Sequence, residues 1–263
     1  MEKKEILKDN IHYIQNLYLS GKSSTDISKI FNCSTGAILY HLNKMNTKMR
    51  LSSQNNRKYT LNENFFDIID NEEKSYFLGL LYADGYVHIK TNKIILQLDN
   101  KDKNILTKLN NIIQSNRPLT KIVVNSKFIH YRLSINNKHM VNELIKNGCG
   151  QKKTLTIRFP HDLPVNLLRH FIRGYFDGDG NIYIDKIKQP EFSLTGNFEF
   201  INECHNVLNK LLSLNPLTIQ KNKNSFRVKY RGKLICHKIY NFLYDDSTIY
   251  FNRKYKIFKS LYS

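Results

Sequence analysis

The feature that most constrains the fold of this chain is a motif that occurs twice. The segments FLGLLYADG at 77–85 and IRGYFDGDG at 172–180 each combine helical spacing of apolar residues with a terminal Asp-Gly pair. The aspartates that close them, Asp84 and Asp179, lie 95 residues apart. Recurrence of a motif in similar surroundings indicates an internal repeat. The sequence therefore predicts one structural unit that is used twice.

Small residues recur at intervals of four within each motif. Gly79 is followed by Ala83, and Gly174 is followed by Gly178. This spacing leaves a groove along one helical face, so that two such helices can pack with their backbones nearly in contact. We therefore expect the two motif helices to run side by side.

This packing would bring Asp84 and Asp179 to the same edge of the molecule. We expect Gly85 and Gly180 to follow them in the left-handed conformation that ends many helices. Carboxylates at helix C-termini oppose the helix dipole and repel each other, so a divalent cation is the natural compensation. Mg²⁺ is held by one or two carboxylates with water and phosphate oxygens, and it can activate water for phosphodiester hydrolysis. Asp-Gly pairs also form simple turns, but that alternative explains one pair better than two matched ones.

The charge of the chain favours a polyanionic partner. Its 263 residues include 41 Lys and Arg against 22 Asp and Glu, which gives a formal net charge of +19. Lys and Arg that neutralise phosphates release condensed counterions, so a nucleic acid is the expected partner; compositional drift towards lysine is the alternative. The charged first residues and the short apolar runs predict an intracellular, unsecreted protein without a membrane span. Four scattered cysteines suggest neither a disulfide framework nor a zinc site.

Residues 1–45 predict a separate helical domain. Helical spacing in the first half includes a capping pattern, Ser23 followed three residues later by Asp26. A short turn then leads to another helix, with Ser34 as its expected N-cap. This order is the helix-turn-helix arrangement, whose second helix fits the major groove of DNA; a helical bundle that binds a protein is the alternative. The residues that we expect to contact DNA from this domain are Thr35, Tyr40 and Lys44.

Residues 46–71 are polar and predict a linker, whose basic side chains could follow a DNA backbone. Two similar halves follow, at 72–160 and 161–263. In each half the motif helix precedes two strands, a helix, two more strands and another helix. The expected strands of the first half are 86–90, 93–99, 119–125 and 128–135. Those of the second half are 181–186, 190–195, 216–221 and 225–231.

Alternation within these strands separates a core face from a basic face. In FRVKYR at 226–231, the aromatic and aliphatic residues occupy one side and the cations occupy the other. A two-stranded ribbon of this kind can lie in a major groove, where its side chains read base edges, whereas a merely solvated face would carry mixed charges. The strand and turn residues that we expect to contact DNA are Lys90, Lys121, His130, Arg132, Lys186, Gln220, Arg227, Lys229 and Arg231.

The two motif segments resemble the signature helices of the LAGLIDADG homing endonucleases in their single-chain, two-repeat form. The resemblance covers about residues 72–260. It implies an α+β fold, in which a pseudo-twofold pair of αββαββα units presents saddle-shaped antiparallel sheets to double-stranded DNA. It also implies a monomer that makes Mg²⁺-dependent double-strand breaks with 3′ overhangs, or breaks that depend on another divalent cation such as Mn²⁺.

Several site positions follow from the resemblance. The final aspartates of the signature fall on Asp84 and Asp179, one for each strand that is cut, and the backbone of Gly85 and Gly180 completes the implied metal site. The implied basic residues, which close each repeat and help to arrange the nucleophilic water, are Lys153 and Lys254, with Lys152 as a rival for the first. The implied polar residues at the end of the second strand are Asn100 and, as a departure from the pattern, Gly196.

Two signature positions differ from the usual family residues. Tyr82 stands where an aspartate is usual, and Arg173 replaces a small residue; we expect both to affect packing more than chemistry. The leading hypothesis is a sequence-specific endonuclease of the homing type that cuts both DNA strands at a long target site. The alternative is a non-cleaving DNA-binding regulator, or a maturase for intron RNA, on the same fold. The presence of both acidic residues and of basic partners favours the nuclease.

Overall fold

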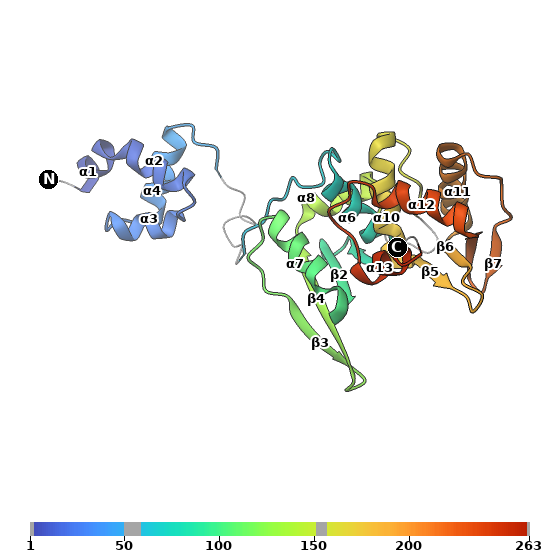
Figure 1. The fold of residues 1–263 in the computed structure, drawn as a ribbon. Helices are drawn as coiled ribbons and strands as arrows, with labels where there is room; N and C mark the ends of the chain where they lie inside the picture. The colour runs from blue at the N-terminus through green and yellow to red at the C-terminus, as the bar shows by residue number, and fades with distance from the viewer. Residues whose placement is uncertain (1–2, 50–58, 151–156, 262–263) are drawn as a thin grey trace. The chain divides into compact units, whose positions relative to one another are not determined.

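The computed structural model describes residues 3–49, 59–150 and 157–261. The chain divides into two compact units, Met1–Tyr59 and Thr60–Ser263, hereafter unit one and unit two (Figure 1). The boundary lies within the predicted linker, and the second part of that linker belongs to unit two because Phe65, Phe66 and Ile69 are buried in its core. No helix in the described part of the chain is long and apolar enough to cross a membrane.

Unit one is a small bundle of short helices. These are α1 (Lys3–Asp9), α2 (Ile11–Leu19), α3 (Ser24–Ile30) and α4 (Thr35–Lys44). The predicted caps are confirmed: the Ser23 hydroxyl accepts a hydrogen bond from Asp26 N, and the Ser34 hydroxyl accepts one from Ala37 N. The core side chains are Leu7, Ile14, Tyr18, Ile27, Ile38 and Leu42. Helices α3 and α4 and the turn between them have the predicted helix, turn and helix order.

The described residues of unit two contain two antiparallel sheets of matching topology, with strand orders β1-β2-β4-β3 and β5-β6-β8-β7. The strands of the first sheet are β1 (Gly85–His88), β2 (Lys93–Asp99), β3 (Thr120–Val124) and β4 (Phe128–Asn136). Those of the second sheet are β5 (Gly180–Ile184), β6 (Pro190–Gly196), β7 (Gln220–Asn222) and β8 (Ser225–Arg231). The predicted strands are therefore present, although β7 begins later than expected. Pro216 has no N–H to donate to a ladder, and the N–H of Leu217 donates to His205 Nε2 at 2.9 Å instead of to a strand.

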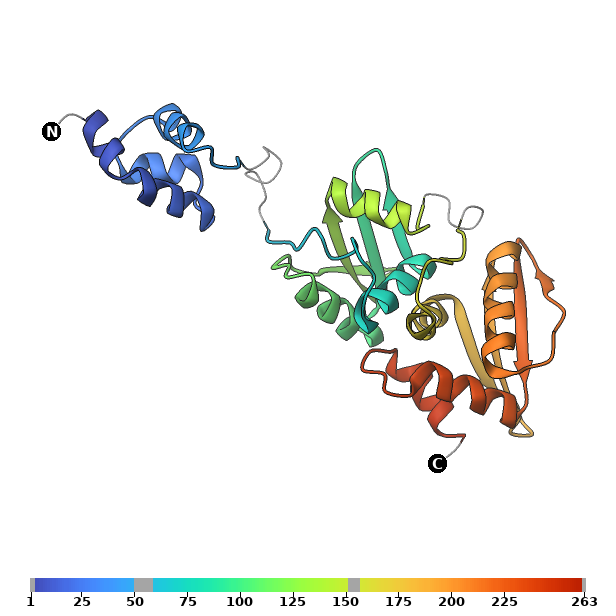
Figure 2. The ribbon, with the colours of Figure 1, turned by 90° about the horizontal axis from the view of Figure 1, so that it is seen from above.

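Helices cover one face of each sheet, and the shared core lies between helices and strands (Figures 1 and 2). The helices of the first repeat are α6 (Glu72–Ala83), α7 (Lys103–Ile112) and α8 (Lys138–Lys146), with a 3-10 turn, η1 (Asn100–Asp102), before α7. Those of the second repeat are α10 (Val165–Asp179), α11 (Phe198–Leu212), α12 (Lys233–Tyr244) and α13 (Asn252–Lys259). This arrangement confirms the predicted α+β class and the duplicated unit.

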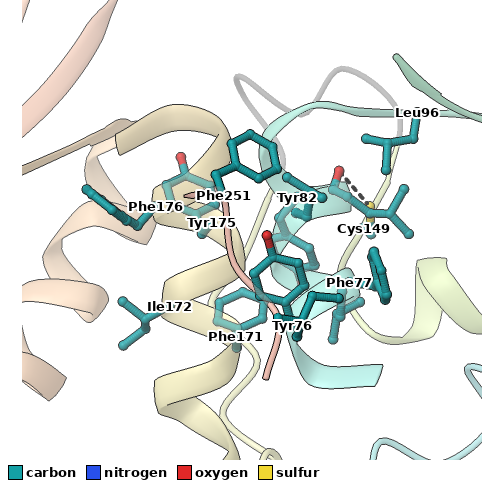
Figure 3. Packing of buried hydrophobic residues seen from close by; sticks show 14 of the residues in the cluster. Tyr76, Phe77, Tyr82, Leu96, Cys149, Phe171, Ile172, Tyr175, Phe176 and Phe251 are labelled. Atoms are coloured by element: carbon teal, nitrogen blue, oxygen red, sulfur yellow. Dashed lines mark hydrogen bonds between the residues drawn. The ribbon is translucent and has the colours of Figure 1, made fainter. Parts of the chain in front are cut away.

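The two motif helices, α6 and α10, pack against each other through their glycines. A methyl group on Gly79 would collide with the carbonyl oxygen of Phe171, and one on Gly174 would collide with that of Tyr76. Aromatic side chains from both helices, with Tyr82 and Tyr175 among them, fill the space around this contact (Figure 3). The predicted close packing of the small residues is confirmed.

The glycines that follow the two aspartates do not adopt the predicted conformation. Gly180 is extended, with φ −94° and ψ 168°, and Gly85 is the first residue of β1. Neither is among the residues with positive φ. Close approach explains both glycines, because a methyl group on Gly85 would lie 2.6 Å from Leu81 O and one on Gly180 would lie 2.6 Å from Phe176 O. The chain turns directly from helix into strand at these points, and a side chain would prevent the turn.

Candidate active site

The two motif aspartates end their helices on one exposed edge of unit two. Asp84 is the C-cap residue of α6, Asp179 is the last residue of α10, and both are exposed. A methyl group on Gly178 would lie 3.1 Å from Asp84 Oδ2, so the Asp84 carboxylate adjoins the residue that directly precedes Asp179. The packing of α6 against α10 thus brings together two carboxylates that are far apart in the sequence.

Two further side chains experience the charge of both aspartates. The first is Tyr175, which is fully buried and whose hydroxyl donates to Thr195 O at 2.7 Å. Burial raises the pKa of Tyr175, and the negative charges of Asp179 and Asp84 raise it further. The second is Lys254, whose pKa burial lowers to about 8, while Asp177 and then the two aspartates oppose the lowering. The shared neighbours place both carboxylates in one electrostatic environment.

Lys254, which the resemblance assigns to the arrangement of water, lies beneath the edge that carries the aspartates. Its side chain is only 4% exposed. The ammonium donates to the carbonyl oxygens of Phe176 at 2.5 Å, Asp177 at 2.8 Å and Gly180 at 2.6 Å. These three bonds account for the three N–H donors of an ammonium group. In this structure Lys254 is therefore bonded to the main chain at the end of α10.

The resemblance also implied a lysine in the first repeat and a polar residue at the end of the second strand of each repeat. Lys153 and its rival Lys152 lie outside the described residues. Asn100 is exposed and begins η1, immediately after β2. Because Gly85 pairs with Leu96 and Gly180 pairs with Leu194, the register makes Phe198, rather than Gly196, the counterpart of Asn100. Gly196 is the last residue of β6, at the strand end that the resemblance implies, but the longer β5–β6 turn puts it two positions before the register match of Asn100.

The donor set at the exposed edge suits a hard divalent cation. Two carboxylates, Asp84 and Asp179, are supplemented by the main-chain oxygens of Gly85 and Gly180, although the Gly180 carbonyl already accepts from Lys254. Within the described ranges, no three His, Cys, Asp or Glu side chains form a metal-binding group. Mg²⁺ commonly uses one or two carboxylates and completes its octahedron with water and phosphate oxygens, so the residues present fit this ion.

The second sheet presents the predicted basic side chains on the face opposite the core. Arg227, Lys229 and Arg231 alternate with the buried residues of β8, and Gln220 pairs with Arg227 across the ladder. Each cation has a partner on this face. Arg227 Nε donates to Thr195 Oγ1 at 3.1 Å, Lys229 pairs with Glu191 at 3.3 Å, and Arg231 pairs with Asp185 at 2.5 Å. The side chains are therefore held in place, and part of their charge is compensated.

In the first sheet, the predicted face is confirmed for Arg132 and wrong for Lys121. Arg132 donates through Nε and Nη2 to Gln97 Oε1, at 3.1 and 2.8 Å. His130 shares this face, whereas Lys121 pairs with Tyr131 and therefore projects from the opposite face. The predicted turn residues Lys90 and Lys186 are both exposed.

The predicted DNA-contacting residues of unit one differ in exposure. Tyr40 is 64% exposed and Lys44 is exposed, and together with Lys8 of α1 they line a cavity of about 540 Å³. Thr35 is half-buried, and its hydroxyl lies 3.4 Å from that of Ser28. The structure therefore brings Tyr40 and Lys44 to one surface and turns Thr35 towards α3.

One further carboxylate of this region, Asp177, was not among the predicted site residues. Asp177 is fully buried, and its Oδ2 accepts from Tyr76 Oη at 2.7 Å and from Phe251 N at 2.8 Å. Burial raises its pKa to about 6, against the opposing charge of Lys254. The available signal was a carboxylate that shares one helical face with His170 and Arg173 in a segment otherwise rich in apolar residues, because buried charges require partners.

This chain is similar to known proteins in structure. No protein-family model and no curated protein matches the chain. Among solved structures, the homing endonuclease I-WcaI bound to its DNA recognition sequence matches with a TM-score of 0.52 at 16% identity, over 73% of this chain and 91% of that one. The LAGLIDADG meganuclease I-CpaMI bound to uncleaved DNA matches at a TM-score of 0.48 and 16% identity, over 73% and 90%. The N-terminal LAGLIDADG domain of DUF199/WhiA matches at 0.45 and 16%, over 74% and 93%. The match to I-WcaI, together with the two sheets of matching topology, shows that unit two has the two-repeat LAGLIDADG fold.

Proposed function

We propose that this protein is a DNA endonuclease that hydrolyses both strands of a duplex with the help of a divalent cation. The observation that carries the proposal is the meeting of Asp84 and Asp179 at one exposed edge, one from each half of the duplicated unit. A carboxylate at a helix C-terminus is electrostatically unfavourable, and a second one beside it adds repulsion. On a chain with a net charge of +19, a cation together with DNA phosphates would relieve that repulsion.

The residues that would hold Mg²⁺ are Asp84 and Asp179, with the main-chain oxygen of Gly85, because the Gly180 oxygen is engaged by Lys254. When bound, the ion supplies an activated water and stabilises the leaving oxygen of the phosphodiester. The chain itself fixes the two carboxylates by close helix packing. It also keeps their surroundings dry on one side through the buried Tyr175 and the aromatic core around it. The outer faces of the two sheets then hold the duplex across this edge.

The matched arginines, Arg132 and Arg227, are the strongest candidates for base contacts. They occupy corresponding strands, β4 and β8, and each is oriented by a neighbour, Gln97 or Thr195. A guanidinium has five N–H donors, so an arginine that uses one or two of them on a neighbour still has donors for guanine or phosphate. Orientation by a fixed neighbour reduces the entropy that is lost on binding.

Unit one would add a second DNA contact through α4, with Tyr40 and Lys44 on its exposed surface. Because the two units are joined in one chain, binding of one raises the effective concentration of the other at a flanking segment. This contact would increase the affinity for DNA and the length of the bound site, but it would take no part in hydrolysis.

The experiment that tests the proposal uses the Asp84→Asn and Asp179→Asn variants. The DNA is a plasmid library with random inserts, from which the wild-type protein selects a bound and cut site. We expect each variant to bind the selected site within about threefold of the wild-type affinity, because one rim charge changes little. Double-strand cutting in Mg²⁺ or Mn²⁺ should fall by at least about a hundredfold, because each carboxylate holds the ion. Asp246→Asn, at another exposed aspartate, is the matched control and should cut normally.

A variant that loses binding while its cutting per bound complex stays unchanged would contradict the metal role. The second candidate function is a DNA-binding regulator that does not cut. The engagement of all three Lys254 donors by the main chain favours it, because this lysine then has no direct part in hydrolysis. A wild-type protein that binds a selected site tightly but leaves it intact in both metals would support the regulator.

A further inference from the structure

The last turn of α10 and the first turn of α13 hold each other through two buried side chains. Lys254, in the first turn of α13, donates to three carbonyl oxygens at the end of α10. Asp177, in the last turn of α10, accepts from Phe251 N, the N-cap residue of α13, at 2.8 Å. Each side chain thus caps the helix on which the other is carried. Both placements are favourable, since an ammonium suits a helix C-terminus and a carboxylate suits an N-terminus.

Lys254 donates to carbonyls that precede and follow Asp179 in the sequence. Those of Phe176 and Asp177 belong to the last turn before Asp179, and that of Gly180 directly follows it. The Phe176 carbonyl also accepts from Gly180 N, but the last carbonyls of a helix otherwise lack a partner within it, so without a cap the turn frays. The Lys254 ammonium also lies 4.6 Å from the centre of the Phe176 ring, which adds a cation–π contact to the cap.

The same helix α13 is fixed to the first repeat. Arg253 Nε donates to Asp102 Oδ2 at 2.9 Å, and Asp102 is itself only 4% exposed. Asp102 ends η1, the short turn that begins with Asn100. Adjacent residues of α13 therefore contact the end of α10 in one repeat and η1 in the other. Movement of α13 would change the position of the Asp179 turn relative to the first repeat.

We infer that Lys254 is a positioning residue, which fixes the last turn of α10 and through it the carboxylate of Asp179, rather than meeting the reacting water. The inference rests on the proposed function for its effect on cutting, but the capping itself does not depend on that function. On this inference, the Asp179 carboxylate takes part in the reaction, and α13 fixes the position of that carboxylate.

The test measures amide hydrogen exchange in the protein without DNA and without divalent ions. Lys254→Met keeps most of the side-chain volume but removes all three donors. We expect exchange in residues 176–182 to become at least about tenfold faster, because the end of α10 then opens locally. Lys256→Met, an exposed lysine on the same helix, is the matched control and should leave the exchange of this segment unchanged.

Removal of Lys254 alone leaves Asp177 as an uncompensated buried charge, and this variant can fail to fold for that reason. The double variant Asp177→Asn/Lys254→Met removes both charges together, and the amide oxygen of the substituted side chain can still accept from Phe251 N. The same acceleration of exchange is expected in the folded double variant. Lys254→Gln has two N–H donors on a shorter side chain in place of three, so it should give an intermediate rate.

The outcomes separate this inference from the proposed function. The inference is supported if exchange at 176–182 becomes faster and if the variants with faster exchange also cut the selected DNA site more slowly. Unchanged exchange with lost cutting would overturn it, because Lys254 would then act on the reacting water, and the proposed endonuclease would stand. Faster exchange in a protein whose wild type cuts no DNA would support the cap and reject the endonuclease.

Discussion

At the scale of single residues, Arg173 shows how one buried charge can organise a whole segment. Arg173 is fully buried, and it donates to Leu243 O at 2.6 Å, Ile249 O at 2.9 Å and Glu72 Oε1 at 2.6 Å. Glu72 in turn accepts from Thr248 N at 2.7 Å. The expectation that Arg173 concerns packing rather than chemistry agrees with these contacts. Its network holds the segment that leads into α13, and therefore the cap on α10.

The histidine beside Arg173 gives a prediction about pH and stability. His170 is buried, and its Nδ1 accepts from Arg173 Nη1 at 2.9 Å. Burial and then the charge of Arg173 lower the pKa of His170 from 6.5 to about 4. Below about pH 6.5 the unfolded chain therefore binds a proton that the folded protein excludes until about pH 4, so stability is lost as the pH falls through this window.

We expect His170→Gln to reduce this loss, because glutamine can accept from Arg173 without titrating. The measurement is the free energy of unfolding by urea at intervals between pH 7 and pH 4, with the wild type and the variant compared. His161→Gln, at an exposed histidine, is the control. Parallel pH profiles for wild type and His170→Gln would show that another group causes the acid sensitivity.

At the scale of elements, the contact between α6 and α10 decides whether the site exists. The glycines allow the two backbones to touch, and the aspartates at the helix ends come together as a result. A methyl group on Gly174 would lie 2.9 Å from Leu80 N and would collide with Tyr76 O. Both obstacles are backbone atoms, which cannot move aside as a flexible side chain can. The two helices would have to separate.

Gly174→Ala is therefore expected to destabilise unit two by about 2–3 kcal/mol, as is usual when extra volume enters a close-packed core. Thermal unfolding followed by circular dichroism measures the loss, and cutting should fall as well because the carboxylates move apart. Gly36→Ala is the matched control: its methyl group would have no neighbour closer than Ser34 Oγ at 3.9 Å. This change should raise the stability of α4 by about 0.5–1 kcal/mol, since alanine favours helix. Equal effects of the two substitutions would contradict the close contact.

At the scale of the whole molecule, the boundary between the units lies between Tyr59 and Thr60, inside the predicted linker at 46–71. Thr60 is already attached to unit two, through a bond from its N–H to Asn116 Oδ1 at 2.9 Å and one from its hydroxyl to Gln114 O at 2.7 Å. Phe65 and Phe66 follow and are buried. Residues 60–71 are thus part of the structure that carries the site.

Two truncations test this boundary. A chain of residues 60–263 should fold with the thermal midpoint of unit two and should cut the selected DNA site, once bound, at the rate of the full chain. Its affinity should be at least about tenfold lower and less dependent on salt, because the cations of unit one are gone. A chain of residues 72–263 should unfold at a lower temperature, since two buried phenylalanines are missing. Equal midpoints for the two chains would show that 60–71 contributes nothing to the core.

The sequence by itself determined the features that depend on local periodicity. The repeat, the helical motifs and the alternation of core and basic faces follow from the spacing of side chains along one element. The same spacing placed seven of the eight strands to within two residues at each end. The caps at Ser23 and Ser34 follow from the same short range. The meeting of Asp84 and Asp179 was also predictable, because a duplicated helix with small residues at intervals of four tends to pack against its own copy.

Only the tertiary structure decided the features that depend on contacts between distant segments. The extended conformation of Gly85 and Gly180 depends on close approach to other backbone atoms. The face from which Lys121 projects and the match of Asn100 with Phe198 depend on strand register, which one element cannot reveal. The cap formed by Lys254 on α10 joins residues more than seventy positions apart. The periodicity of a segment records which face it buries, but which atoms a buried polar group meets there is decided by the packing of the whole chain.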